Sequence, residues 1–223
     1  MNTPSHKGRC PDQILTEHVY HDAQGFAFRA ASWIDWTRSS GQFTAFHYSC
    51  IDGRLAIEHL IFEQLVITAG ENLDAAVYQR CVNEPRKLDK LLRGIVPEYE
   101  KLQDFTEIVA TLMPSAPPIN KWDIAELRKL WGKLSHYLHW SGAHPETTEN
   151  LQWQHTAIEE VADIVEPIWE KISIGHSGCM PPESMAPHTR EVWEEFKADR
   201  ISRECARERL SSAPNSDERD KNV

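Results

Sequence analysis

The stretch TENLQWQHTAIEEVADIVEPIWEKI, residues 148–172, decides the fold of this chain. Positions that are alternately four and three apart carry mostly apolar side chains, which is the spacing of a helix that packs one face along another helix. We expect His155 to lie on this seam as a hydrogen-bonded core histidine, and Pro167 to kink the helix near its end. The seam consists of Leu151, His155, Ile158, Ala162, Val165, Trp169 and Ile172.

Helical spacing also occurs in the chain before this stretch. Apolar residues recur three and four apart in several segments, and glycine, asparagine or proline lies at most of the expected ends. The segment 43–69 is unusually apolar, as the central helix of a bundle would be. The expected helices span about 15–37, 43–69, 72–83, 85–96, 99–112 and a segment that Asn120 caps and that includes 129–140.

Two proline-rich segments divide the chain. MPSAPPIN (113–120) separates two predicted helices, because proline cannot continue a helix, and IGHSGCMPPESMAP (174–187) precedes a charged segment. We therefore predict an all-α fold, namely an antiparallel helical bundle of five to six helices plus a C-terminal helix on a linker. The predicted ranges are a flexible N-terminus at 1–13, the bundle at 14–173, the linker at 174–187, the charged C-terminal helix at 188–210 and a disordered tail at 211–223.

The composition argues against several classes of protein. No apolar run approaches the ~20 residues that cross a bilayer, and the start MNTPSHKGRCPDQ lacks the apolar core of a signal peptide, so we expect a cytoplasmic protein without membrane contact. The five cysteines are widely spaced and include no Cys-x-x-Cys pair, which argues against a disulfide framework and a thiolate zinc site. The formal net charge of −10 weighs against tight, sequence-independent binding of nucleic acid, although it is compatible with a local basic cleft.

Candidate chemistry is concentrated in KLWGKLSHYLHW, residues 129–140. On a helix, the leucines and Trp131 form one apolar face, whereas His136 lies nearly opposite that face and His139 lies roughly 60° from His136. Neither histidine is therefore expected in the core. A solvated face near a helix C-terminus is one interpretation, because the histidines and the two lysines of the stretch suit the helix dipole there.

A metal site or a catalytic nucleophile is a second interpretation of the same stretch. His136 and His139 could share an ion, with His144 or Glu146 as a third ligand. However, the chain contains no His-Glu-x-x-His pattern, no Gly-x-Ser-x-Gly elbow and no glycine-rich phosphate loop. We therefore predict no metal and no cofactor.

A third interpretation comes from a resemblance to a known family. LRKLWGKLSHYLHWSG (127–142), followed by a loop and the helix of 148–172, resembles the final helix pair of HEPN-like domains (higher eukaryotes and prokaryotes nucleotide-binding). IDGRLAIEHLIFEQL (51–65) resembles the polar-interrupted buried helix of that family. The resemblance covers roughly residues 15–173 and implies an all-α bundle that forms a homodimer. Catalytic members carry an arginine and, shortly after it, a histidine, and two protomers bring these groups together to cut RNA without metal.

The resemblance implies candidate catalytic residues in this chain. The histidine would perform acid–base chemistry on a ribose hydroxyl, and the basic partner would hold the phosphate charge. Lysines occupy the arginine positions here, while Arg128 is one position too far from His136, and lysine lacks the bidentate fork of arginine, which favours a catalytically silent member. The candidates are His136 and His139 with Lys133, Lys129 and Arg128.

Two further sets of residues are candidates for binding. The literal Arg-x4-His string occurs as Arg54 to His59, but inside an apolar helix, where we expect Arg54 and Glu58 to form an intrahelical pair or a buried polar contact. Together with His59 they could line the same groove as His136. The charged C-terminal helix offers Trp193 and Phe196, which either fold back onto the bundle or dock on a partner protein.

Two functions stay open from the sequence. The first is a catalytically silent or weakly active HEPN-like interaction protein, which the resemblance places in a bacterial toxin, defence or regulatory assembly. The second is a metal-independent endoribonuclease that uses His136 or His139 with the nearby lysines and Arg128 across a dimer cleft. The expected partners are a second copy of the chain, a protein bound through the C-terminal helix and, for the second function, RNA.

Overall fold

The computed structural model describes residues 4–17, 20–70, 73–83, 88–113, 118–139 and 150–212. The predicted cap at Asn72, the predicted helix start at Pro85, the third-ligand candidates His144 and Glu146, and the predicted tail beyond residue 212 lie outside the described residues. The helices, in chain order, are α1 (Pro11–Thr16), α2 (Ala23–Ser40), α3 (Thr44–Ala69), α4 (Ala75–Asn83), α5 (Leu88–Ile95), α6 (Tyr99–Thr111), α7 (Ile124–Tyr137), α9 (Leu151–Ile174), the 3-10 helix η4 (Pro182–Ser184), α10 (Pro187–Lys197) and α11 (Arg203–Ser211).

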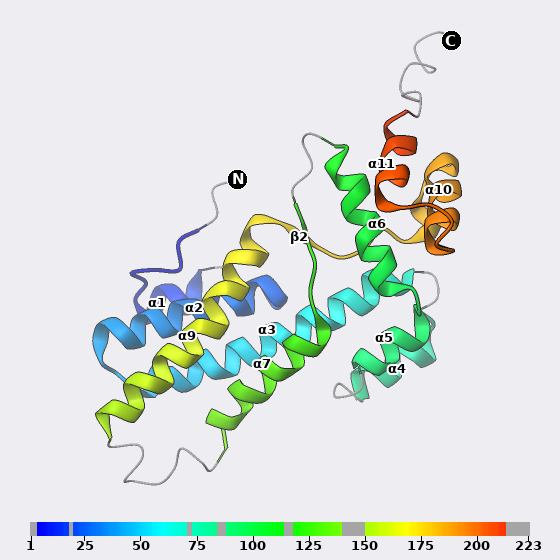
Figure 1. Cartoon of the computed structure of the whole chain (residues 1–223). Helices are drawn as coiled ribbons and strands as arrows, with labels where there is room; N and C mark the ends of the chain where they lie inside the picture. The colour runs from blue at the N-terminus through cyan, green and yellow to red at the C-terminus, as the bar shows by residue number, and fades with distance from the viewer. Residues whose placement is uncertain are drawn as a thin grey trace.

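The all-α prediction is confirmed, with more helices than expected (Figure 1). Within the described part of the chain, eight α-helices precede residue 175, where the expected ranges named seven and the predicted bundle had five to six. The helix expected at 15–37 is two helices, because α2 begins only after Asp22, whose carboxylate accepts a hydrogen bond from Gly25 N at 2.7 Å. None of the described helices is both long enough and apolar enough to cross a membrane.

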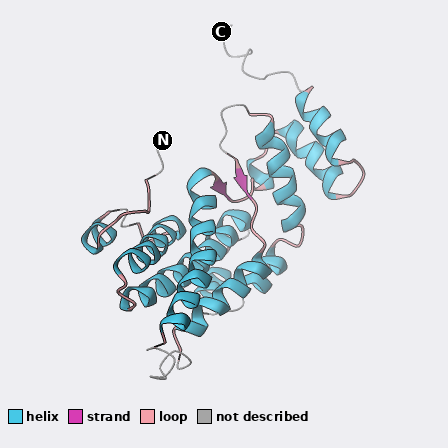
Figure 2. Ribbon diagram, turned by 60° about the vertical axis from the view of Figure 1, so that its left-hand side comes forward, coloured by secondary structure: helices cyan, strands magenta, loops and turns pink. Residues whose placement is uncertain are grey.

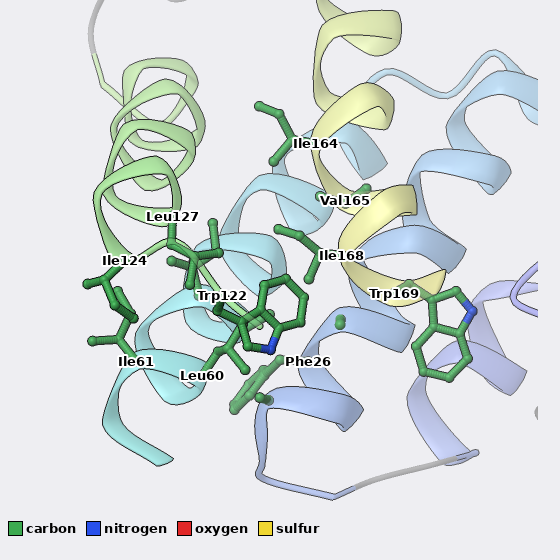
Figure 3. Close-up of a cluster of buried hydrophobic side chains, with 14 of the residues drawn as sticks. Phe26, Leu60, Ile61, Trp122, Ile124, Leu127, Ile164, Val165, Ile168 and Trp169 are labelled. Atoms are coloured by element: carbon green, nitrogen blue, oxygen red, sulfur yellow. The ribbon is translucent and has the colours of Figure 1, made fainter. Parts of the chain in front are cut away.

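Helix α3 is the centre of the bundle, as the apolar segment 43–69 predicted. It packs against α2, α7 and α9, and α9 also packs along α2. Figure 3 shows Leu60 of α3, Trp122, Leu127 of α7 and Ile168 of α9 in one buried cluster. Burial of apolar area in this cluster holds together α2, α3, α7 and α9, which are called the long helices below.

At Gly53, side chains of α7 and α9 approach the backbone of α3 closely. A Cβ atom at this position would lie 2.8 Å from Val165 Cγ1 of α9 and 3.1 Å from Leu134 Cδ1 of α7. These distances are shorter than van der Waals contact, so the glycine allows both helices to approach α3 closely. The packing gain offsets the low helix propensity of glycine in the middle of α3.

The heptad seam of α9 holds only in its C-terminal two thirds. Ala162, Val165 and Trp169 are buried, but Leu151 is 78% exposed and His155 is exposed, so the expectation of a core histidine is wrong. At the N-terminal end of α9, Trp153 packs on Phe43 and Tyr137 in place of the predicted seam residues. Helix α9 continues past Pro167 to Ile174.

The predicted C-terminal helix is two helices that fold back onto α6. Asp199, between α10 and α11, has φ 56°, and Ser202 begins α11 by accepting a hydrogen bond from Cys205 N at 3.2 Å. A left-handed residue ends a helix, so one helix over 188–210 is not formed. Figure 2 shows α6, α10 and α11 grouped at one end of the molecule, beyond the long helices.

The connecting segments are tied to the helices. Residues 119–120 (β1) and 176–177 (β2) form a short parallel pair. The prediction that Asn120 caps α7 is wrong. Asp123 caps this helix, because its carboxylate accepts hydrogen bonds from Ala125 N and Glu126 N at 2.8 and 3.1 Å. The side chain of Asn120 instead donates to Lys171 O of α9 at 2.6 Å.

The N-terminal segment is packed where the structure describes it. His6 is only 8% exposed, with its Nε2 atom 3.9 Å from Glu166 Oε1 of α9, and Gly8 N donates to Asp35 Oδ2 of α2 at 2.8 Å. These two residues thus contact α9 and α2, whereas the flexibility of residues 1–13 stays a prediction.

Candidate functional site

Helix α7 is amphipathic in the way the sequence predicted. Leu127 and Leu134 are buried against α3, while the basic candidates on the helix are exposed. His139 follows the end of α7 and is also exposed, with its backbone N donating to His136 O at 3.3 Å. The prediction that neither histidine is a core residue is confirmed. The exposed candidates Arg128, Lys129, Lys133 and His136 are called the basic face of α7 below.

The basic face of α7 lies in a partly acidic setting. Lys129 Nζ is 2.9 Å from Glu126 Oε2, in a pair whose side chains are 74% and 51% exposed. The ring of His136 lies 5.8 Å from that of Tyr137, and the Tyr137 hydroxyl donates to Glu160 of α9. Burial and this carboxylate raise the pKa of Tyr137 above its usual value. Tyr137 is thus a hydrogen-bond donor between helices at neutral pH.

Arg54 and Glu58 form the intrahelical pair that their spacing predicted. Arg54 Nε donates to Glu58 Oε1 at 3.0 Å, and Trp131 Nε1 of α7 donates to the same oxygen at 2.7 Å. The Arg54 guanidinium also lies 4.6 Å from the centroid of the Trp131 ring. These three residues form a polar junction between α3 and α7, in which a cation–π contact supplements two hydrogen bonds.

His59 does not join this junction. Its ring packs against Phe26 of α2, with 4.8 Å between the ring centroids, and burial lowers its pKa. His136 is five residues after Trp131 on α7, which turns it about 140° away from the Arg54 junction. The structure therefore does not bring Arg54, Glu58 and His59 together with His136 in one groove of a single chain.

Trp193 and Phe196 of α10 are used within the chain. The Trp193 ring lies 5.4 Å from that of Phe105 of α6, and the Phe196 ring lies 5.7 Å from it. Trp193 is 2% exposed and Phe105 is fully buried. The C-terminal segment was expected either to fold back onto its own chain or to dock on a partner protein. In the structure it folds back, and Trp193 is therefore not accessible to a partner.

Sequence reasoning missed a buried ion pair between α2 and α3. Arg29 Nη2 lies 3.2 Å from Asp52 Oδ1, in a pair whose side chains are 11% and 14% exposed. Burial raises the pKa of Asp52, and the hydrogen bond from Arg29 opposes that rise. The two residues are 23 positions apart, so no local spacing could have indicated the pair.

Sequence reasoning also missed a row of partly exposed side chains on α3. Tyr48 and Ile51 are 51% and 42% exposed, and Leu55, His59 and Phe62 continue the row at helical spacing with intermediate exposure. This row, Tyr48, Ile51, Leu55, His59 and Phe62, is called the outer stripe of α3 below. The signal was present in the sequence, because segment 43–69 is apolar on more sides than one buried face requires.

The outer stripe lies between two neighbouring helices. On one side, Asp52 pairs with Arg29 of α2 and His59 packs on Phe26. On the other side, Glu58 bonds to Trp131 of α7. The ends of the stripe also pack within the chain, because the Tyr48 ring lies 5.3 Å from that of Trp33 of α2 and the Phe62 ring lies 5.8 Å from that of Tyr78 of α4. The exposed apolar surface of the stripe is therefore centred on Tyr48 and Ile51, and exposed apolar side chains that lie together are typical of a surface that binds another protein.

The described residues contain no group of three or more histidine, cysteine, aspartate or glutamate side chains placed to hold a metal ion. Comparison with protein-family models, with curated proteins and with solved structures gives no match for this chain.

Proposed function

We propose that this protein is a helical interaction protein that has no catalytic activity of its own. The observation that supports the proposal is the outer stripe of α3, in which Tyr48 and Ile51 are exposed on the central helix of the bundle. A central helix normally buries such residues, so their exposure favours a surface that a partner covers. The HEPN-like relationship and a role in a bacterial toxin, defence or regulatory assembly are part of the same proposal, and they rest on the resemblance of residues 51–65 and 127–142.

The arrangement of the candidate catalytic residues favours a catalytically silent protein. General acid–base catalysis needs a histidine and a phosphate-binding cation within reach of the same few atoms. In one chain, the catalytic candidate Lys129 is instead engaged with Glu126, and the binding candidate Arg54 is engaged with Glu58 and Trp131. The side chains that do meet form contacts between helices or along a solvated face.

A second candidate function is metal-independent cleavage of RNA. The observation that favours it is the basic face of α7, which gathers cationic side chains on one exposed helix of a chain whose net charge is −10. Such a face could contact phosphates locally in spite of the overall charge. A second protomer would have to supply the remaining groups of the active site.

Incubation of the full-length protein with mixed RNA in excess chelator tests the proposal. We expect no cleavage by the wild type. Cleavage that is lost in a His136→Ala, His139→Ala double variant would overturn the proposal in favour of the ribonuclease. The matched control is a His155→Ala, His176→Ala double variant, because these histidines are exposed elsewhere on the chain. Circular dichroism verifies that each variant is folded.

A further inference from the structure

His6 is buried beside α2 and α9 with one of its ring nitrogens unpaired. The residue is 8% exposed, and its Nε2 atom has no hydrogen-bond partner among the described residues. Nε2 lies 3.9 Å from Glu166 Oε1 of α9, which is too far for a hydrogen bond, and that oxygen already accepts from Arg38 Nη1 at 2.7 Å. This arrangement suits a neutral ring, because a protonated imidazole needs an acceptor for each of its two N–H groups.

Charged side chains of three elements surround His6 in the described part of the chain. Glu166 and Glu170 belong to α9, Asp35 belongs to α2, and Lys7 is the next residue of the same segment. Burial lowers the pKa of His6 below its ordinary value of 6.5, and Lys7 adds to this effect, whereas the three carboxylates oppose it. The ring is therefore neutral at pH 7 while the segment is in place.

The segment that carries His6 is attached to the bundle by few contacts. Gly8 N donates to Asp35 Oδ2 of α2 at 2.8 Å, and the Arg9 guanidinium lies 5.6 Å from the centroid of the Phe28 ring. In α1, all of which the structure describes, Ile14 is the only buried residue. A segment with so few buried apolar contacts belongs to the part of a protein that opens most readily. Residues 4–16 are called the N-terminal cover below.

The N-terminal cover lies on a small apolar cluster that is separate from the main core. Ile14 packs with Trp33 of α2 and Ala45 of α3, and the half-buried Trp36 packs against them. The Trp33 ring also lies 5.3 Å from the ring of Tyr48, which is 51% exposed. Release of the cover would therefore expose the side of this cluster on which Ile14 packs, and it would enlarge the apolar surface that Tyr48 already presents.

We propose that the N-terminal cover is a pH-sensitive device, in which protonation of His6 releases residues 4–16 from α2 and α9 and uncovers the apolar cluster of Trp33 and Trp36. A histidine whose pKa is lower in the closed state takes up its proton mainly after release. Closing is therefore most favourable above pH 6.5 and becomes less favourable as the pH falls below that value. Release requires no partner, so the inference stands or falls separately from the proposed function.

Hydrogen exchange of the full-length protein at pH 7.0 and pH 5.5 tests the release, with exchange times corrected for the intrinsic effect of pH. We expect the protection of residues 4–16 to fall by up to about tenfold at pH 5.5, because a single proton is taken up mainly below a pH of about 6.5. Protection of α3 should stay unchanged. Binding of the apolar dye ANS should increase at pH 5.5, because the cluster under Ile14 becomes accessible.

Two variants of His6 separate its protonation from other effects of acid. His6→Gln and His6→Phe should both abolish the response to pH, because neither side chain takes up a proton, and the variant that keeps wild-type protection at pH 7.0 gives the result. The matched control is His155→Gln, which should respond like the wild type, because His155 is exposed on α9. NMR of labelled histidine rings follows the titration of His6 directly and decides if both variants lose the cover at pH 7.0.

Three outcomes would each overturn the inference. The first is equal protection of residues 4–16 in the wild type at both pH values. The second is a response to pH that persists in a His6 variant whose cover is closed at pH 7.0. The third is a His6 ring that titrates above its ordinary value of 6.5 in the folded protein. None of these outcomes depends on RNA cleavage, which tests the proposed function separately.

Discussion

The indole of Trp131 donates a hydrogen bond to Glu58 across 2.7 Å, and this contact joins α7 to α3. The same carboxylate oxygen accepts from Arg54, so one acidic side chain satisfies a donor on its own helix and a donor on the neighbouring helix. The junction borders the outer stripe of α3. It therefore fixes the position of one border of the stripe relative to α7.

Replacing Trp131 by phenylalanine should weaken this junction without changing the apolar contact much. The variant keeps an aromatic ring for Arg54 but loses the indole N–H, and we expect a loss of about 1 kcal/mol in the free energy of unfolding, measured by urea denaturation. Trp153→Phe is the control, because this half-buried ring packs on Phe43 of the loop before α3 and on Tyr137. Equal losses in the two variants would contradict a specific role for the hydrogen bond.

Removing Arg29 should destabilise the protein in a pH-dependent manner. Burial already raises the pKa of Asp52, and loss of the cation would raise it further. An acid whose pKa is higher in the folded state stabilises the fold at low pH and loses that contribution as the pH rises through the folded pKa. Arg29→Met should therefore cost about 3 kcal/mol at pH 7 and less near pH 4. Urea denaturation at the two pH values measures this difference.

The control for the Arg29 prediction is a cation on the surface. Lys129→Met removes one partner of an exposed pair, and it should change the free energy of unfolding little at either pH, because solvent screens such pairs. A cost of Arg29→Met that was equal at pH 4 and pH 7 would show that Asp52 does not take up a proton when its partner is lost.

Two glycines in helices should respond to alanine in opposite directions. Gly53→Ala places a methyl group 2.8 Å from Val165 Cγ1, and we expect a loss of about 1–3 kcal/mol in the free energy of unfolding. Gly132→Ala meets no atom within 4 Å on the exposed side of α7, and its higher helix propensity should stabilise the protein by about 0.5–1 kcal/mol. Thermal unfolding of both variants measures the signs, and a gain in Gly53→Ala would contradict close packing at this position.

The cysteines should differ in reactivity. Burial raises the pKa of both Cys50 and Cys179 to about 12, whereas Cys10 is exposed. Because the thiolate is the reactive form, iodoacetamide at pH 8 should label Cys10 in the native protein and should label Cys50 and Cys179 only after unfolding. Peptide mass spectrometry measures the labelling at each site. Rapid native labelling of Cys179 would show that the segment covering it opens readily.

The sequence predictions were accurate where neighbouring residues determine the structure, and inaccurate where composition and spacing carry no signal for it. Helix α3 spans Thr44–Ala69, close to the predicted 43–69, because a long apolar segment that ends at glycine specifies a helix locally. The predicted helix over 188–210 was wrong because the turn depends on the left-handed conformation of Asp199, which composition and spacing do not indicate.

In the candidate site, the contact within one helix could be predicted, whereas the contacts between helices could not. The Arg54–Glu58 pair is confirmed because residues four apart are neighbours on any α-helix. Trp131 as the third member of the junction could not be predicted, since its contact with Glu58 depends on how α7 packs against α3. For the outer stripe of α3, the excess of apolar residues in segment 43–69 was visible in the sequence, but which of them are exposed is set by their neighbours in the fold.

Trp193→Ala should release the C-terminal helices from α6. Trp193 is 2% exposed and contacts the buried ring of Phe105, so we expect truncation to cost about 3–5 kcal/mol in the stability of this part of the chain. The loss should be local, because α10 and α11 pack chiefly on each other and on α6. Hydrogen exchange should therefore accelerate in α6, α10 and α11 but not in α2. Acceleration that was equally large in α2 would show that the C-terminal helices and the long helices unfold as one unit.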